Sequence, residues 1–492
     1  MIRNGKHIAA NHSSESGTSL RRQPMFGRMR HVHMVGIGGI GMSSIAEVLL
    51  RRGYRVTGSD LAESAVTQHL QDLGATVFLG HDAPNIEGSS VVVHSSAVDA
   101  HENPETVAAS KYHIPVIARS EMLGELMRMK FGIGIAGTHG KTTTTTMAGH
   151  VIGAGDFDPT VIVGGKVSAF GSNAVSGEGD IILIEADEYD RTFLRLTPSV
   201  AVITNIDADH LDCYADLDDI KKAFIQYASS VPFFGVAIVC LDDANVRAIL
   251  PEIQRRIVTY GTSKEAQIRA ENIRQEGRIM HFDVVSENVR LGLVSLNGPG
   301  QHNVLNALAA IAVGIELEMD FDDIARGIAS FEGVDRRMHE IGEANKIMVV
   351  DDYAHHPTEV LATLDAAKGC WPDRRIFAVF QPHLYSRTRQ FELEFARAFV
   401  NSDVLVVMDV YGAREEPEDG ISGELIANGA AANGHPEVYY EPDKNQLVQR
   451  VIDLAEPGDV ILTMGAGDIW RLNRDIFSTL SKTELSNAEQ LN

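Results

Sequence analysis

Short apolar runs alternate with amphipathic stretches along most of the chain. "RHVHMV" predicts a strand over residues 31–35, and the next segment places Ile45, Val48 and Leu49 on one face of a helix before a second strand at 54–58. Later apolar runs, "SSVVVH" and "IPVIA", continue this order to about residue 130. A regular β–α alternation of this kind predicts a doubly wound, mostly parallel sheet.

The same alternation starts again twice further along the chain. "FGIGIA" at 131–136, "DIILIE" and "PSVAVIT" predict strands of a second sheet, and "IMVVDD", "RIFAVF", "DVLVVMDV" and "DVILTM" predict strands of a third. A chain of 492 residues agrees with three domains at roughly 150 residues each. We therefore expect an α/β protein with three domains. They are a Rossmann-like domain at 29–130, a P-loop ATPase-type mononucleotide-binding domain at 131–333 and a second Rossmann-like domain at 334–480, with flexible tails at 1–28 and 481–492.

Charge and cysteine content narrow the possible functions. The chain has 43 basic and 67 acidic residues, a formal net charge of −24, which argues against nucleic acid as the main partner. Its three cysteines, at 213, 240 and 370, are too sparse for a disulfide framework and favour a reducing compartment. The sequence has no long apolar run and no apolar signal segment in its first 28 residues, so we expect a cytoplasmic protein without membrane insertion.

A first glycine motif, "GIGGIG", follows the strand at 31–35 and opens a helix. Its G-x-G-x-x-G spacing lets the backbone approach a diphosphate at a helix N-terminus, and an acid 19 residues further on can hold ribose hydroxyls. NAD and a UDP-sugar both fit this pattern, and glycines used only for packing are the alternative. The candidate binding residues are Gly36, Gly38, Gly39, Gly41, Asp60, Ser95 and Ser96.

A second glycine motif, "GTHGKT" at 137–142, lies between a predicted strand and a predicted helix. The common phosphate loop, G-x-x-x-x-G-K-[ST], requires a glycine at 135, where this chain has Ile135. A shorter loop starting at Gly137 still directs backbone amides of 138–143 at phosphates, Lys141 at the β/γ oxygens and Thr142 at Mg²⁺. The candidate loop residues are Gly137, Thr138, His139, Gly140, Lys141, Thr142 and Thr143.

Acidic side chains follow the next two predicted strands. "IEADEYD" supplies Glu185, Asp187 and Glu188. "TNIDADHLD" supplies Asp207, Asp209, His210 and Asp212. Strand ends rich in oxygen ligands beside a phosphate loop suit Mg²⁺ bridging the phosphates of ATP. The alternative for any one of these acids is a solvated loop residue.

Over about residues 29–475 the chain resembles the Mur ligase family, the ATP-dependent amide-bond-forming enzymes of peptidoglycan precursor synthesis. The motifs that carry the resemblance are "GIGGIGM", "GTHGKTTT", "EADEYDRTF", "TNIDADHLD", "GQHNVLNALAA", "GVDRRMH", "DDYAHHPTE", "FQPHLYSRT" and "GAGDIW". Histidine at 139 and the "DDYAHHP" segment point to the alanine-adding branch and its close relative, the murein-peptide ligase. The resemblance implies joining of L-alanine to the carboxylate of UDP-N-acetylmuramate through an acyl phosphate, with ADP and phosphate as products.

The resemblance also implies roles for particular residues. The nucleotide group comprises Lys141 at the phosphates, Thr142 and Glu185 on one Mg²⁺, His210 on a second, Asn303 and Asn306 near adenine, Arg336 near the phosphates and Asp351 at the ribose. The amino-acid group comprises Tyr353, His355 and Arg387, with His383 nearby. The first domain would bind UDP-N-acetylmuramate.

One position departs from the family pattern. The family commonly has "FQPHRYSRT", whereas Leu384 replaces that arginine here and removes a guanidinium next to the reaction centre. Some Mur ligases use a carbamylated lysine, and the sequence assigns none, since Lys221 and Lys222 are typical of a helix surface. Monomer and homodimer stay open, as does the strictness for L-alanine over glycine or serine.

Two other classes of protein are consistent with parts of the sequence. An NAD-dependent dehydrogenase would use "GIGGIG" and leave "GTHGKT" and both acidic strand ends without a role. A nucleotide-gated binding module without chemistry would need neither "DDYAHHP" nor "FQPHLYSRT". The two classes differ from a ligase in product formation.

Overall fold

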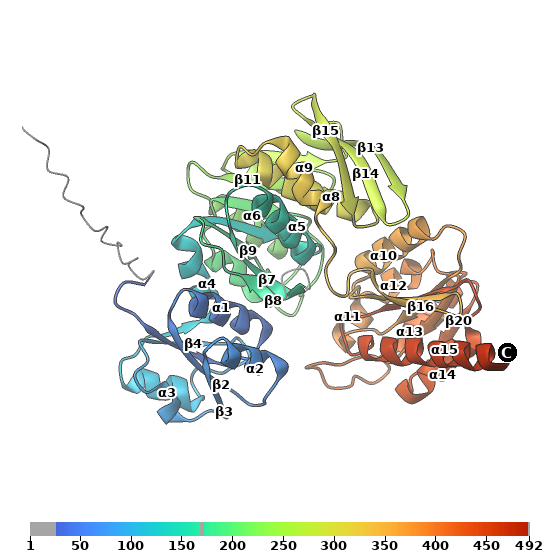
Figure 1. Ribbon diagram of the computed structural model, residues 1–492, viewed down its shortest axis with the longest axis horizontal. Helices are drawn as coiled ribbons and strands as arrows, with labels where there is room; N and C mark the ends of the chain where they lie inside the picture. Colours follow the sequence, from blue (N-terminus) through green and yellow to red (C-terminus); the bar gives the residue numbers. More distant parts are fainter. Residues whose placement is uncertain (1–25, 168–171, 491–492) are drawn as a thin grey trace, which may run out of the picture.

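The computed structural model describes residues 26–167 and 172–490 and contains three sheets in chain order (Figure 1). The expected N-terminal tail, 1–28, lies outside the described residues except for its last three positions. The three-domain α/β architecture predicted from the sequence is confirmed. The middle unit lies between the other two, with helix α1 of the first unit packed against β7 and β8 of the middle one (Figure 1).

The first sheet is parallel, with strand order β3-β2-β1-β4-β5. Its strands are β1 (His31–Val35), β2 (Arg55–Asp60), β3 (Thr76–Leu79), β4 (Val91–His94) and β5 (Val116–Ala118). Its helices are α1 (Ile40–Arg51), α2 (Ala65–Asp72), α3 (Pro104–Lys111) and α4 (Arg119–Arg128). Val35 pairs with Ser59 and with His94, so the glycine loop, Asp60 and Ser95 meet at one edge.

The second sheet has ten strands in the order β15-β14-β13-β12-β11-β10-β6-β9-β7-β8. The strands are β6 (Phe131–Ala136), β7 (Thr160–Val167), β8 (Ser172–Val175), β9 (Ile181–Glu185), β10 (Val200–Ile203), β11 (Val236–Cys240), β12 (Ile257–Gly261), β13 (Ile268–Glu276), β14 (Ile279–Ser286) and β15 (Val289–Asn297). The helices are α5 (Lys141–Ala154), α6 (Leu217–Ser229), α7 (Ala244–Ile249), α8 (Gln301–Glu316) and α9 (Phe321–Ala329). The antiparallel pairs β13–β14, β14–β15 and β7–β8 extend a parallel centre.

The third sheet has the order β16-β17-β21-β18-β19-β20, with only β16 antiparallel to its neighbour. The strands are β16 (His339–Ala344), β17 (Ile347–Asp352), β18 (Ile376–Phe380), β19 (Val404–Val407), β20 (Val438–Tyr440) and β21 (Val460–Met464). The helices are α10 (Pro357–Cys370), α11 (Tyr385–Gln390), α12 (Glu392–Ala398), α13 (Gly423–Ala432), α14 (Lys444–Leu454) and α15 (Trp470–Gln490).

Helix α15 differs from the expected tail. The sequence analysis ended the last domain at residue 480, whereas the helix continues to Gln490. Ile476 and Leu480 anchor its first half in the core, and Ser481 Oγ donates to the Phe477 carbonyl at 2.8 Å. The following "SKTELSNAEQ" lacks glycine and proline, so a docked helix can continue through this polar segment.

Strand pairing fixes where the second glycine loop lies. β6 is bonded on one side to β9 and on the other to β10, with Ile135 opposite Glu185 and Ala136 opposite Ile203. The loop that leaves β6 therefore lies between the acidic segments that follow β9 and β10. Sheet register alone brings the three motifs together at the carboxyl edge, where parallel sheets bind ligands.

Tyr227 is a buried residue of α6 whose unsatisfied hydroxyl lies against Gly134 of β6. The side chain is fully buried, its ring stacks on Phe193 at 5.0 Å, and its oxygen has no hydrogen-bond partner among the described residues. We expect Tyr227→Phe to raise the free energy of unfolding by about 1 kcal/mol, because it removes a buried polar group that forms no bond. Urea denaturation measures this change.

Tyr214→Phe is the matched control. The Tyr214 hydroxyl is also buried but donates to the Glu188 carbonyl at 2.6 Å, so this variant should lose about 1 kcal/mol. Equal destabilisation by both variants would contradict the assignment of Tyr227 as unsatisfied.

Candidate active site

The second glycine loop adopts a backbone that requires glycine at two positions. Gly137 has a φ of 142°, and a Cβ there would lie 1.9 Å from Thr204 Oγ1. Gly140 has a φ of 80°, and its Cβ would lie 2.5 Å from Asn306 Oδ1. Ile135 lies within β6 and is fully buried. The loop is therefore shorter than the common phosphate loop and starts at Gly137.

Part of the loop backbone is already bonded within the protein. The amides of Thr138 and His139 donate to the carbonyl and the side chain of Asn205, at 3.2 and 2.8 Å. Pairing within the helix begins with Thr144 N, which donates to the Gly140 carbonyl at 2.9 Å. The amides of 140–143 form the helix N-terminus, a natural anion site. The available donors are thus fewer than the predicted set of 138–143.

Lys141 folds back onto its own loop. Its ammonium donates to the Gly137 and Thr138 carbonyls at 2.7 and 3.1 Å, and it pairs with Glu188 at 2.7 Å. Burial opposes the charge, but Glu188 and Asp187 outweigh it and raise the pKa of Lys141. Burial alone would raise the pKa of the Glu188 carboxyl, but Lys141 and His210 hold this pKa below its usual range. The loop cation is therefore charged and held by protein oxygens that phosphates can replace.

Thr142 and Glu185 lie together as predicted for a metal pair. The threonine hydroxyl is 3.0 Å from both carboxylate oxygens of Glu185, and the Gly164 amide donates to the same carboxylate at 2.7 Å. Burial raises the pKa of both Glu185 and Asp187, so each would be stabilised in its charged form by an added cation.

His210 approaches the same place from the segment after β10. It has a φ of 55°, and its Nε2 lies 3.5 Å from Glu188 Oε1. Burial lowers and Glu188 raises the pKa of His210, with a net upward shift. Glu188 thus contacts both Lys141 and His210. The sequence marked Glu188 as a strand-end acid but gave it no individual role.

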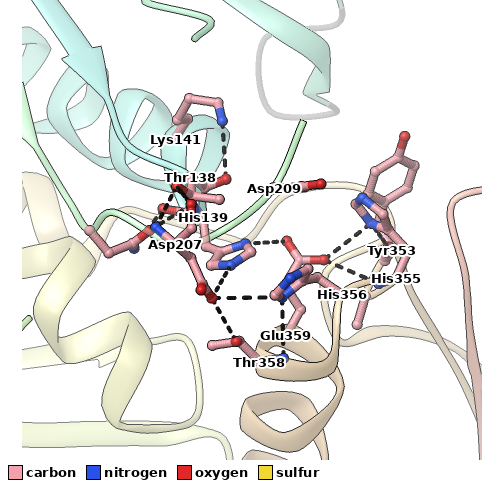
Figure 2. Close-up of polar contacts among 12 residues, drawn as sticks. Thr138, His139, Lys141, Asp207, Asp209, Tyr353, His355, His356, Thr358 and Glu359 are labelled. Carbon is pink, nitrogen blue, oxygen red and sulfur yellow. Dashed lines mark hydrogen bonds and ion pairs between the residues drawn. The ribbon is translucent and has the colours of Figure 1, made fainter. Parts of the chain in front are cut away.

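Residues of the C-terminal domain meet the loop directly (Figure 2). His139 lies with Nε2 at 3.2 Å from Asp207 Oδ2 and Nδ1 at 3.3 Å from Glu359 Oε1. Although burial opposes protonation, these two carboxylates raise the pKa of His139 to about 9. Thr358 Oγ1 also donates to Asp207 at 2.8 Å. Two domains therefore share one network of hydrogen bonds and ion pairs.

The predicted amino-acid residues also lie at this boundary. Arg387 is buried and donates to Asp209 Oδ1 at 2.7 Å, and its Nη1 lies 3.3 Å from His383 Nδ1. Burial, together with His355 and Arg387, lowers the pKa of His383 to about 4. Leu384 is buried with a φ of 69°, and its amide donates to the Tyr411 carbonyl at 3.0 Å.

His355 has a defined proton position. Its Nδ1 lies 3.0 Å from the Tyr353 carbonyl and 3.1 Å from Glu359 Oε2, and both of these partners only accept. The proton of the neutral imidazole is therefore on Nδ1, which leaves Nε2 with a lone pair. The ring lies 5.2 Å from that of Tyr353 and 5.9 Å from that of His383.

A cavity of about 280 Å³ opens beside the loop, between the middle and C-terminal domains. Among its lining residues are the predicted His139, Gly140, Thr143, Asn303 and Asn306, the strand-end acid Asp207, and His302, Arg337, Asp352 and Glu359, to which the sequence gave no individual role. Arg336 and Asp351, expected at the nucleotide, instead bond to each other at 3.2 Å and are not part of this lining. Glu359 closes the motif "DDYAHHPTE", but nothing in the sequence indicated its contact with His139.

The first glycine loop forms a separate group on the first sheet. Gly36 has a φ of 76°, and its amide donates to the Ser59 carbonyl at 2.8 Å. The Gly38 amide donates to Asp60 Oδ2 at 2.8 Å, so Asp60 supports the loop itself. A Cβ on Gly36 would lie 3.2 Å from Ser95 Cβ, and one on Gly41 would lie 2.6 Å from Arg119 Nη1. Arg119 is a cation beside the loop that the sequence analysis missed. Of the other candidates here, Gly39 is the N-cap of α1 and Ser96 is exposed.

None of the helices in the described part of the chain combines the length and apolar character needed to cross a membrane.

The fold and this site define an α/β nucleotide-binding protein whose site is completed by a neighbouring domain. Three family models match the chain: "Mur ligase family, catalytic domain" over 31–131, "Mur ligase middle domain" over 135–314 and "Mur ligase, glutamate ligase domain" over 336–467. The UDP-N-acetylmuramate–L-alanine ligase of Salinibacter ruber is 62% identical over 452 residues, which are 92% of this chain and 95% of the relative. The chain belongs to the Mur ligase family.

Two solved structures extend the comparison. The UDP-N-acetylmuramate–alanine ligase of Thermotoga maritima is 30% identical with a TM-score of 0.76, covering 92% of this chain and 100% of its own. A murein peptide ligase of Psychrobacter arcticus is 25% identical with a TM-score of 0.66, covering 92% and 99%.

Gly137 offers a direct test of the loop geometry. Gly137→Ala introduces a Cβ 1.9 Å from Thr204 Oγ1 at a φ of 142°, so the loop has to move. We expect a loss of at least ~10-fold in ATP affinity, about 1.4 kcal/mol, measured by calorimetry. Gly153→Ala is the control, because a Cβ there, within the same helix α5, meets nothing within 4 Å. It should keep ATP affinity and gain about 0.5–1 kcal/mol of stability. Unchanged affinity in Gly137→Ala would contradict the loop assignment.

Proposed function

We propose that this chain joins L-alanine to UDP-N-acetylmuramate with consumption of ATP, giving UDP-N-acetylmuramoyl-L-alanine, ADP and phosphate. One observation carries the proposal: the nucleotide loop and the predicted amino-acid residues face each other across one domain boundary, where His139 lies 3.3 Å from Glu359 and Glu359 lies 3.1 Å from His355. Membership of the Mur ligase family and the names of the alanine-adding relatives support it. The reaction belongs to the cytoplasmic stage of peptidoglycan precursor synthesis, with the enzyme acting as a monomer or homodimer.

Each of the three domains is assigned one substrate. We assign UDP-N-acetylmuramate to the domain at 29–130, ATP to 131–333 and the amino acid to 334–480. The diphosphate of the sugar nucleotide fits the glycine loop at Gly36 and Gly38, with Arg119 as an additional cation. Gly39, Gly41, Asp60, Ser95 and Ser96 stay assigned to this subsite.

ATP fits the second loop and the cavity beside it. Phosphate oxygens would accept hydrogen bonds from the amides of 140–143. They would also accept hydrogen bonds from the Lys141 ammonium, which would leave the Gly137 and Thr138 carbonyls. Asn303 and Asn306 line the cavity where the adenine would lie. Arg336 and Asp351 stay predictions for the phosphates and the ribose, and they would have to turn away from each other to reach the nucleotide.

The residues at the strand ends fit Mg²⁺. Thr142 and Glu185 offer a hydroxyl and a carboxylate that already lie 3.0 Å apart. Burial raises the pKa of Glu185, so a bound cation would stabilise its charged form. His210 is assigned to a second ion, beside Glu188. Mg²⁺ held there would neutralise charge on the transferring phosphoryl group.

The first chemical step makes the carboxylate reactive. An oxygen of the muramoyl carboxylate attacks the γ-phosphorus of ATP in line, the bond from that phosphorus to the β–γ bridging oxygen breaks, and ADP leaves. Lys141, released from the Gly137 and Thr138 carbonyls, would neutralise the charge that develops on the γ-phosphoryl group and on the bridging oxygen. The acyl phosphate hydrolyses readily, so closure of the C-terminal domain over the loop has to exclude water.

The second step forms the amide. The alanine nitrogen attacks the acyl carbon, the carbon–oxygen bond to phosphate breaks and phosphate leaves. The ammonium must first lose a proton, and His355 Nε2 carries the lone pair that can accept it, because Nδ1 is held by Tyr353 and Glu359. Arg387 can pair with the alanine carboxylate. Its present partners, Asp209 and His383, occupy two of its nitrogens.

Phosphate release tests the proposal directly. The purified protein is given ATP, Mg²⁺ and UDP-N-acetylmuramate, with either L-alanine or L-Ala-D-Glu-diaminopimelate. Release that depends on L-alanine, with the matching mass gain on the UDP-sugar, is the expected result. Release with the tripeptide alone would assign the chain to murein-peptide ligation, the activity named for the Psychrobacter arcticus structure. No release with either substrate would contradict both.

Lys141→Ala should abolish product formation and leave UDP-sugar binding within a few-fold. The ammonium pairs with Glu188 at 2.7 Å, and its loss leaves that carboxylate without its main partner. Turnover and UDP-sugar affinity are measured on the same preparation. Lys221→Ala, on helix α6 and outside the site, is the control that should retain turnover. Near-normal turnover in Lys141→Ala would remove the assignment of Lys141.

Arg387→Ala should raise the KM for alanine or reduce kcat by at least ~100-fold. Removing one partner of a buried ion pair costs about 3 kcal/mol, which corresponds to a change of this size. The loss should be greater than for Arg389→Ala, which changes an exposed arginine of the same helix paired with Glu418. Unchanged alanine kinetics in Arg387→Ala would show that the amino-acid site lies elsewhere.

A further inference from the structure

Three side chains at the domain boundary converge without a role in the mechanism above. His139 precedes α5, Asp207 follows β10 and His356 is the N-cap of α10 (Figure 2). One potential ligand atom from each lies within 4.8 Å of the others. His139 Nε2 and His356 Nδ1 lie 3.2 and 3.7 Å from the same oxygen of Asp207, and the imidazole centroids are 4.8 Å apart.

We propose that His139, Asp207 and His356 form a binding site for one Zn²⁺-like transition-metal ion that links the nucleotide loop to the C-terminal domain. Two imidazoles and one carboxylate are a three-ligand set that Zn²⁺ accepts with a fourth position open. Mg²⁺ favours oxygen ligands, so this site differs in chemistry from the one assigned to Thr142 and Glu185. The proposal does not depend on the ligase reaction.

The spacing suits a tetrahedral ion. Zinc–nitrogen and zinc–oxygen bonds of about 2.0–2.2 Å place neighbouring ligand atoms roughly 3.3 Å apart. The two separations from Asp207, 3.2 and 3.7 Å, bracket this value. The widest pair of ligand atoms, within 4.8 Å, has to draw closer, which side-chain rotation can supply.

Two of the three ligands, His139 and Asp207, already have outer partners. The second nitrogen of His139, Nδ1, lies 3.3 Å from Glu359, the carboxylate–histidine arrangement that orients metal-binding imidazoles. Thr358 Oγ1 donates to the Asp207 carboxylate at 2.8 Å. His356 is 2% exposed, and its Nε2 finds no hydrogen-bond partner in the described part of the chain. A simple ion pair of protonated His139 with Asp207 and Glu359 does not explain why His356 Nδ1 lies 3.7 Å from the same Asp207 oxygen. To bind the ion, this nitrogen has to give up its 3.4 Å contact with the Thr358 amide.

The ion would have a structural consequence. His139 and Asp207 belong to the middle domain, whereas His356 begins the first helix after β17 of the C-terminal domain. Occupation of the site therefore holds the two domains in the arrangement of this structure. Because His139 and Asp207 also line the cavity, the ion would restrict the loop on which ATP is proposed to bind.

Metal binding to the full-length protein tests the proposal without any turnover. Chelator-treated protein, free of nucleotide, is titrated with Zn²⁺ against a chromophoric chelator, and separately with Co²⁺ followed by visible absorption. We expect one Zn²⁺ per chain, an intense Co²⁺ spectrum typical of tetrahedral coordination, and a rise in the thermal midpoint with Zn²⁺.

His356→Asn is the main variant. Asparagine keeps the N-cap that His356 now supplies to the Thr358 amide at 3.4 Å, and it removes the imidazole. We expect Zn²⁺ affinity to fall by more than about 100-fold, beyond the ~10–100-fold typical of outer-shell changes. Asp207→Asn should do the same, and Glu359→Gln should weaken binding by ~10–100-fold.

Two control variants locate the ion. His302→Gln removes another buried imidazole of the same cavity, and Glu185→Gln alters the site assigned to Mg²⁺. Both should keep the wild-type Zn²⁺ affinity. Equal affinity in the wild type, His356→Asn and Asp207→Asn would overturn the proposal, and so would a loss confined to Glu185→Gln. The phosphate-release assay, run with Mg²⁺ and a zinc chelator, reports separately on the ligase reaction.

Discussion

The carboxylates at the boundary between the middle and C-terminal domains are each paired with a cation, and these pairs determine the arrangement of the site. Glu188, Asp209 and Glu359 are at most 10% exposed, and Asp207 is 33% exposed. Leaving an enclosed carboxylate without its cation is strongly destabilising. The pairs are Lys141 with Glu188, His139 with Asp207 and Glu359, and Arg387 with Asp209. Two of these pairings, His139–Glu359 and Arg387–Asp209, join residues of different domains. These two ion pairs link the domains, and opening them would separate the paired charges.

The substrates of the proposed reaction are themselves anions, so they compete with protein carboxylates for these cations. Lys141 can bind a phosphate only by leaving the Gly137 and Thr138 carbonyls. Arg387 pairs with Asp209 through Nη2, and its Nε has no hydrogen-bond partner in the described part of the chain, so it can also donate to a substrate carboxylate. Binding then exchanges one set of ion pairs for another of similar geometry. Such an exchange costs little desolvation, because the cations are already buried, and it couples substrate binding to the position of the C-terminal domain.

The sequence predicted contacts that depend on neighbouring strands and missed those that depend on how domains meet. Thr142 and Glu185 were predictable, since parallel strands deliver both to one edge and the register of β6 with β9 places them 3.0 Å apart. Arg387 and Asp209 are 178 positions apart in different domains, so no periodicity links them. Glu359 closes the motif "DDYAHHPTE", but its contact with His139 of the middle domain could not be read from it. The antiparallel strands β13–β15 and the continuation of α15 were missed because their mixed, polar patterns lack the long apolar runs of buried strands.

A crystal structure of the protein with a non-hydrolysable ATP analogue, Mg²⁺ and L-alanine would test the exchange of ion pairs most directly. We expect the Lys141 ammonium to leave the Gly137 and Thr138 carbonyls for the β- and γ-phosphate oxygens, and Arg387 to contact the alanine carboxylate. A structure in which Lys141 keeps its contacts of 2.7 and 3.1 Å to those carbonyls, while the phosphates bind elsewhere, would contradict this expectation.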